Sequence, residues 1–217
     1  MSIPTIRYNT FVIFIIASMV FAANGKRSDQ KELAIHHFMQ GEFLLNQGNY
    51  ALAVLEFQDA LDIDPNASTI HISIADAYRR LGRSKHAEDH LQIAIDLNPE
   101  ELSSREMLGH LYMINRRYKE SEKEFLILSN LDIYNDNYII TLADLAKLQE
   151  KWGLSVDYYL QAFDLNPQNL KALENALQVC LGAELFNRAE TLCLKLAKND
   201  PVNISYWKTY KLSLIHI

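Results

Sequence analysis

Two histidines at helical spacing are the side chains of this sequence that could bind a metal ion. His86 and His90 occur in the stretch His-Ala-Glu-Asp-His, and a helix would place both imidazoles on one face. The pattern differs from the His-Glu-x-x-His motif of zinc peptidases, and the sequence has no Gly-x-Ser-x-Gly elbow and no glycine-rich phosphate loop. We therefore interpret both histidines as solvated surface residues. We expect no catalytic residue, no cofactor and no metal site.

Cys180 and Cys193 are the only cysteines of the chain. An even number of cysteines in an exported protein allows a disulfide. Free cysteines also behave as small buried hydrophobic residues. We expect two buried free thiols, with a disulfide between them as the alternative.

The composition favours helices and argues against a nucleic-acid partner. Only 7 glycines and 5 prolines occur among 217 residues, which is few for a β protein with many tight turns. Leu, Ala, Glu, Lys and Gln are plentiful, and these residues are good helix formers. The net charge is −6, whereas binding to a nucleic-acid duplex depends on neutralising phosphates with Lys and Arg.

The first 25 residues have the layout of a secretory signal peptide. Arg7 precedes an apolar run over residues 11–22, and small residues follow at Ala22, Ala23 and Gly25. The run is short for a membrane span, which needs about 20 residues. We predict a signal peptide over 1–25, a polar linker over 26–33, and export to a bacterial periplasm or cell envelope. The alternative is an uncleaved signal-anchor, which would be the chain's only contact with a membrane.

A period of 34 residues runs through the rest of the chain. Four prolines follow this period, at Pro65, Pro99, Pro167 and Pro201, and Ile133 occupies the vacant position. The same register aligns two columns of mostly small residues and one of mostly large residues. The first small column is Ala53, Ala87, Ser121, Ser155 and Ala189; the large column is Phe57, Leu91, Phe125, Tyr159 and Cys193; the second small column is Gly41, Ala75, Gly109, Ala143 and Leu177.

The period predicts a stack of helix pairs. Each unit of 34 residues divides into two helices of about 14 residues. Gly48 and Gly82 mark the turn between them, because glycine ends helices by tolerating positive φ. The small residues allow the two helices to cross closely, with the large column beside them. We expect each proline to close the second helix of its unit, because it lacks an amide proton.

These columns resemble the tetratricopeptide repeat (TPR). The first unit carries the pattern as Gly41, Gly48, Tyr50, Ala53, Phe57, Ala60 and Pro65, and the second as Ala75, Tyr78, Gly82, Ala87, Leu91, Ala94 and Pro99. The resemblance implies an all-α α-solenoid, a right-handed superhelix of antiparallel helix pairs. It spans five units, at 34–67, 68–101, 102–135, 136–169 and 170–203. Leu177 departs from the small-residue pattern, which affects the helix crossing of the fifth unit.

The resemblance also implies a concave groove, formed by the first helix of each unit, that binds a peptide or a partner helix. The family's groove positions fall here on residues of both charge signs and on scattered apolar residues. They are Phe38, Glu42, Leu45, Ile72, Asp76, Arg79, Arg80, Glu106, His110, Met113, Ile140, Asp144, Lys147, Lys171, Glu174 and Gln178.

One family function is argued against by the residues themselves. Members that bind chaperone tails hold a C-terminal carboxylate with Lys and Asn at set groove positions. Those positions carry Phe38 and Glu42 here, with Ser73 and Ser103 beyond them. Because Glu42 would repel a carboxylate, we do not expect such a clamp.

The end of the chain leaves two readings of function open. Residues 204–211 begin a sixth unit, with Trp207 at its fourth position, and 212–217 match the translation of a common sequencing adapter, so we expect more chain after Lys211 in the intact protein. The first reading is a non-catalytic scaffold for protein–protein interaction, with self-association through the unfinished unit as a further possibility. The alternative is the substrate-recruiting arm of a larger enzyme, such as a glycosyltransferase.

Overall fold

The computed structural model describes residues 29–199 and Lys208. The predicted signal peptide and the first part of the predicted linker lie outside the described residues. So do residues 209–217 and all of the predicted sixth unit except Lys208. Export and the nature of the C-terminal residues therefore stay predictions.

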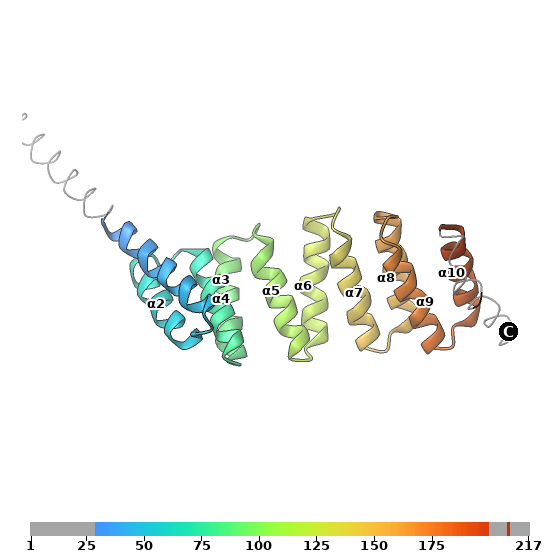
Figure 1. Ribbon diagram of the computed structural model, residues 1–217, viewed down its shortest axis with the longest axis horizontal. Helices are drawn as coiled ribbons and strands as arrows, with labels where there is room; N and C mark the ends of the chain where they lie inside the picture. Colours follow the sequence, from blue (N-terminus) through green and yellow to red (C-terminus); the bar gives the residue numbers. More distant parts are fainter. Residues whose placement is uncertain (1–28, 200–207, 209–217) are drawn as a thin grey trace, which may run out of the picture. The chain divides into compact units, whose positions relative to one another are not determined.

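The described chain is all-α, as predicted (Figure 1). Residues 29–46 are helical, so residues 29–33 belong to a helix and not to a linker. Nine further helices of 13 or 14 residues follow, close to the predicted length. They are α2 (Tyr50–Ile63), α3 (Ser68–Arg80), α4 (Ser84–Leu97), α5 (Leu102–Ile114), α6 (Tyr118–Leu131), α7 (Asp136–Leu148), α8 (Trp152–Leu165), α9 (Leu170–Gly182) and α10 (Phe186–Asn199).

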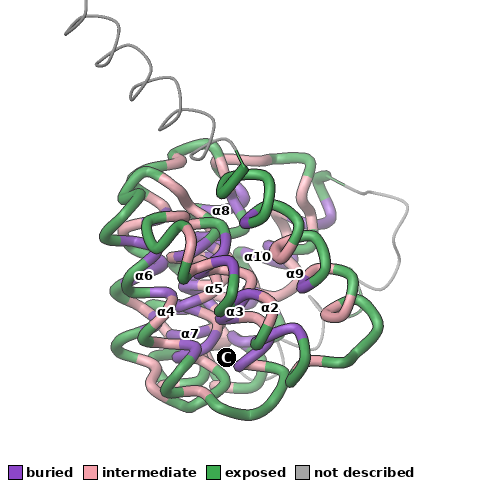
Figure 2. The backbone as a smooth tube through the Cα atoms, turned by 90° about the vertical axis from the view of Figure 1, so that its left-hand side faces the viewer, coloured by how far each residue is buried: buried purple, intermediate pink, exposed green. Residues whose placement is uncertain are grey.

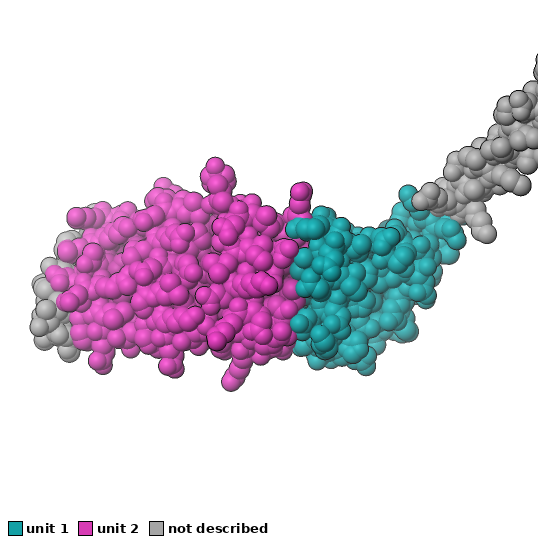
Figure 3. Space-filling view, turned by 180° about the vertical axis from the view of Figure 1, so that it is seen from behind, with its two compact units in different colours: residues 1–99 teal, residues 100–217 magenta. Residues whose placement is uncertain are grey.

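The helices pack as antiparallel pairs in two compact units (Figure 3). The unit that ends at Pro99 contains helix 29–46 and helices α2 to α4, with α3 packed on α2 and on α4. The unit that starts at Glu100 contains α5 to α10, and each of its helices packs on the next one in the chain. We call them unit 1 and unit 2. Among the described residues, no helix is long and apolar enough to cross a bilayer.

The turn inside each pair is a Schellman motif that recurs every 34 residues. In the first two pairs the left-handed position is Gly48 (φ 80°) or Gly82 (φ 72°), as predicted. In the next three pairs it is Arg116, Glu150 or Glu184, each with φ near 59°. The residue after each of these positions donates its N–H to a carbonyl five residues earlier, at 2.8 to 2.9 Å, which satisfies a carbonyl at the helix end.

This difference predicts that Glu150→Gly stabilises the protein. A side chain in the left-handed region costs about 1–2 kcal/mol, and the greater freedom of glycine in the unfolded chain offsets part of the gain. We expect a net gain of about 0.5–1 kcal/mol in the free energy of unfolding, measured by urea titration. The matched change Gly82→Ala should lose about 1 kcal/mol, because nothing lies within 4 Å of an added Cβ there and only φ opposes it. Equal effects of the two changes would contradict the argument.

The prolines do not set where the second helices end. The helices α2, α4, α6 and α8 all stop two residues before the proline column, although α6 is followed by Ile133. The residue after each helix is Asp or Asn in the same extended conformation, for example Asp132 with φ −123° and ψ 84° and Asn98 with φ −140° and ψ 83°. The expectation that proline closes each helix is therefore wrong, because the turn forms equally without it.

The three columns form the interior of the stack (Figure 2). Gly41 faces Phe57 so closely that a Cβ on Gly41 would lie 2.5 Å from the ring, and a Cβ on Gly109 would lie 2.8 Å from Phe125. The two columns have complementary sizes throughout, since glycine occurs with phenylalanine and alanine with leucine or tyrosine. Leu177 follows the same rule, because the large-column position of its repeat holds the small residue Cys193, buried in the same cluster.

Both cysteines are free and buried, as expected. Burial raises the pKa of Cys180 to about 11 and also raises the pKa of Cys193. The thiols therefore stay protonated near neutral pH and act as packing groups.

Candidate functional site

A pocket of about 260 Å³ opens between helix 29–46 and the start of α3 in unit 1. It is formed mainly by apolar side chains, with one charge of each sign at its wall. The lining residues are Lys31, Ala34, Ile35, Phe38, Asp64, Ala67, Thr69 and Ile70. Its size and lining suit one apolar side chain of a partner.

Phe38 connects this pocket to the core. Its ring lies 5.9 Å from the ring of Phe57, which in turn fills the space left by Gly41. Phe38 itself is only partly buried and so keeps a face toward the pocket. The close approach of two helices at a glycine therefore positions a predicted groove residue.

Glu42 lies one helical turn after Phe38, so both side chains occupy the same face of helix 29–46. Its Oε1 atom is buried and has no hydrogen-bond partner among the described residues. A buried carboxylate oxygen without a donor costs free energy, and a hydrogen bond from a cationic group would recover it. The remaining groove position of this helix, Leu45, is partly buried.

The groove charges of α3 satisfy one another. Arg79 Nε donates to Asp76 Oδ1 at 3.0 Å, and Arg80 Nε donates to Asp76 Oδ2 at 2.8 Å. Burial alone would raise the pKa of Asp76, but the hydrogen bonds from both guanidinium groups outweigh it and hold the pKa below its ordinary value. Arg80 also lies over the ring of Tyr50 at 5.6 Å. These predicted residues come together, but as an internal network, with Ile72 partly buried nearby on the same helix.

Unit 2 shows the same internal pairing among its predicted groove residues. Lys147 Nζ lies 2.7 Å from Asp144 Oδ1, and the hydroxyl of the buried Tyr159 also donates to that carboxylate. The bond to Asp144 and burial raise the pKa of Tyr159 well above its ordinary value, with burial the larger cause. Lys171 pairs with Glu174 at 3.4 Å. The charged groove positions of α7 and α9 are therefore paired within their own helices.

The other predicted residues of unit 2 are spread over three helices. Glu106 accepts a hydrogen bond from the Tyr138 hydroxyl at 3.4 Å and lies 3.9 Å from His110 Nε2. His110 makes an edge contact with Phe125. Met113 and Ile140 pack against the core, and Gln178 is exposed.

A pair of side chains 19 residues apart, which the sequence analysis missed, joins the two helices of each pair. The pair is polar in the first three repeats: His37 with Glu56 at 2.8 Å, His71 with His90 at 3.0 Å, and Arg105 with Glu124 at 3.1 Å. In the last two repeats the same positions hold Ile139 with Tyr158 and Leu173 with Leu192. Complementary charges at a fixed spacing in the 34-residue register were the signal that could have revealed it.

The histidine pair corrects the interpretation of His90 as a solvated surface residue. His71 Nε2 lies 3.2 Å from the carbonyl of Pro65, which can only accept, so this nitrogen carries the proton. His71 Nδ1 then accepts from His90 Nδ1. Desolvation, followed by the proximity of His71, lowers the pKa of His90 from 6.5 to about 4. His86 is exposed, and its ring lies 5.0 Å from that of Tyr78.

Comparison with known proteins relates this arrangement to a repeat family. The family model described as "Tetratricopeptide repeat" matches residues 27–68 and 72–128. The chain is 36% identical over 91 residues to the Caenorhabditis elegans protein O-mannosyl-transferase F38B6.6, covering 42% of this chain and 13% of that protein. It is 24% identical over 178 residues to the human protein O-mannosyl-transferase TMTC3, covering 82% of this chain and 17% of that protein. The chain thus spans less than a fifth of the length of these relatives.

Solved structures show the same fold at low sequence identity. The MamA protein superposes with a TM-score of 0.68 at 14% identity, covering 81% of this chain and 96% of that one. YrrB, described as a TPR protein with an unusual peptide-binding site, superposes with a TM-score of 0.63 at 16% identity, covering 87% of this chain and 97% of that one. The first TPR of Spaghetti (RPAP3), bound to the HSP90 peptide SRMEEVD, gives 0.52 at 21% identity, covering 55% of this chain and 95% of that one.

Proposed function

This chain is a tetratricopeptide-repeat protein, and from that premise we propose that unit 1 binds a protein partner through a short segment that combines an apolar with a basic side chain. The apolar side chain enters the pocket beside Phe38. The basic side chain donates to Glu42, one helical turn further along the helix. The chain acts in this role as a non-catalytic scaffold.

The observation that carries the proposal is the buried Oε1 of Glu42 without a donor. The charges of Asp76, Arg79 and Arg80 are already paired, so they contribute less to recognition. An exposed ion pair that already exists has little to gain from a ligand. Glu42 differs because a donor from the partner would complete its hydrogen bonding in a site sheltered from water.

A peptide array tests this proposal with the full chain. The array carries ten-residue peptides in which Leu or Ala is combined with Arg, Gln or Glu one or two positions away. We expect the Leu–Arg peptides to bind best and the Leu–Glu peptides worst. Glu42→Gln should weaken binding of the Leu–Arg peptides by about tenfold or more, because it removes a charge-assisted hydrogen bond. Fluorescence anisotropy with a labelled peptide selected from the array measures the change.

The control variants separate the pocket from the general charge of the helix. Glu32→Gln removes a charge from an exposed position of the same helix and should leave the affinity unchanged. Phe38→Ala should reduce the preference for Leu over Ala. Thermal unfolding of each variant establishes that the fold is kept. If Glu42→Gln binds the Leu–Arg peptides as well as the unchanged protein does, Glu42 is not the recognition group.

A second candidate function rests on the resemblance to protein O-mannosyl-transferases. In this reading the repeats recruit substrate for an enzyme of which this chain is one part. The size of the intact protein distinguishes the two readings. An antibody raised against residues 29–199 should detect a product far larger than 25.0 kDa if a catalytic domain is attached.

A further inference from the structure

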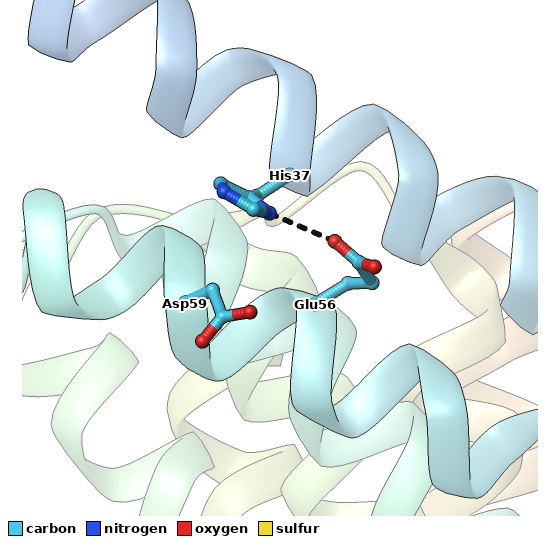
Figure 4. Close-up of side chains that lie close together, drawn as sticks. All are labelled: His37, Glu56 and Asp59. Carbon is cyan, nitrogen blue, oxygen red and sulfur yellow. Dashed lines mark hydrogen bonds and ion pairs between the residues drawn. The ribbon is translucent and has the colours of Figure 1, made fainter.

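We propose that His37, Glu56 and Asp59 form a binding site for a divalent transition-metal ion, with zinc as the ion that suits them best. Figure 4 shows the three side chains at the contact between helix 29–46 and α2. None of them lines the pocket beside Phe38, so the inference is independent of the proposed peptide binding.

The donor atoms are already close together. His37 Nδ1 lies 2.8 Å from Glu56 Oε2, and the ligand atoms of all three residues lie within 4.8 Å of one another. Zinc bonds to imidazole and carboxylate at about 2.0–2.2 Å, which in a tetrahedron places ligand atoms roughly 3.3 Å apart. Small side-chain rotations of Glu56 and Asp59 therefore bring the atoms to bonding positions. The helix backbones need not move.

Imidazole with two carboxylates is a ligand set that zinc and related first-row metals accept. Three protein ligands leave the fourth tetrahedral position for water. Binding needs the Nδ1 lone pair of His37, so the proton on that nitrogen leaves when the metal arrives. Glu56 then exchanges its hydrogen bond with His37 for a bond to the metal.

The local charge favours a cation at this place. Glu56 and Asp59 have no lysine or arginine partner among the described residues, and α2 carries three acids and no base. In the third repeat the equivalent carboxylate, Glu124, is neutralised by Arg105. The first repeat thus has an additional acid, Asp59, where the equivalent positions of the second and third repeats hold Ile93 and Ile127.

Metal titration of the full chain tests the site. Zinc chloride in about tenfold molar excess should raise the midpoint of thermal unfolding by about 4 °C or more, because the ion binds only the folded pair of helices. Asp59→Asn and His37→Gln should each lose this shift. Co²⁺ should give visible absorption bands of a tetrahedral site in the unchanged protein and not in these variants.

Matched variants distinguish this site from the other histidines and acids of the chain. His36→Gln and Asp62→Asn alter exposed neighbours of the proposed ligands, and His90→Gln alters the histidine pair of the second repeat. All three should keep the zinc shift. Asp59 is exposed, so Asp59→Asn should fold normally even if His37→Gln does not. Absence of a shift in the unchanged protein, or a shift that survives Asp59→Asn, would overturn the proposal.

Discussion

Gly41→Ala should lower the free energy of unfolding by about 2 kcal/mol. An added Cβ would lie 2.5 Å from Phe57 Cε1 and 2.6 Å from Cδ1, and that ring is completely buried and has no space to retreat. Overpacking of this kind costs about 1–3 kcal/mol, which exceeds the ~0.5–1 kcal/mol that alanine gains over glycine in a helix. Urea unfolding followed by circular dichroism measures the loss.

The second repeat supplies the compensating change. It holds Ala75 where the first repeat holds Gly41, and Leu91 where the first repeat holds Phe57. The double variant Gly41→Ala with Phe57→Leu therefore reproduces a pair that the chain already uses. We expect it to recover most of the loss, with a coupling energy of about 1–2 kcal/mol between the two positions. Additive effects would show that the two side chains do not compete for the same space.

Gly182→Ala is the control for glycine replacement as such. Gly182 is the last residue of α9, and nothing lies within 4 Å of a Cβ built on it. Its replacement should leave stability unchanged or raise it by up to about 1 kcal/mol. A loss as large as that of Gly41→Ala would contradict the steric explanation.

Acidification from pH 7 to about pH 4.5 should destabilise unit 1 through His90. The folded-state pKa of His90 is about 4, below the ordinary value of 6.5. The unfolded chain therefore binds the proton more readily, so stability is present above pH 6.5 and is lost as the pH falls toward 4. Since His90 is only about half buried, we expect a loss on the order of 2 kcal/mol.

His90→Gln should remove most of this pH dependence. The amide can still donate to His71 Nδ1 but does not titrate. The exposed neighbour His86 provides the matched control, because His86→Gln should keep the pH dependence. Thermal unfolding at the two pH values, compared among the three proteins, isolates the contribution of His90. An identical pH dependence in all three would show that another group is responsible.

The 34-residue register made the interior predictable from the sequence. The small and large columns, the two glycine turns and the buried thiols follow from residue type and spacing, because each depends on size or on positive φ at glycine. The left-handed conformation of Glu150 could not be predicted in this way. Its side chain shows no preference for that region, and the Schellman hydrogen bonds of the turn impose it.

The groove was harder to predict because family positions do not show whether a charge is already paired. The spacing of Asp76, Arg79 and Arg80 at three and four residues indicates an internal network on a helix, and the structure has one. The isolation of Glu42 could not be read from the sequence. It depends on the depth at which its Oε1 atom lies among residues from other helices.

The order in which the helices pack has a consequence for how the protein is made. Within each unit, the main helix contacts join elements that are consecutive in the chain, such as α5 with α6 and α6 with α7. The chain segments that must close to form these contacts are short, so the contact order is low and folding should be fast. Each pair can dock as soon as it leaves the ribosome, before the rest of its unit has been synthesised.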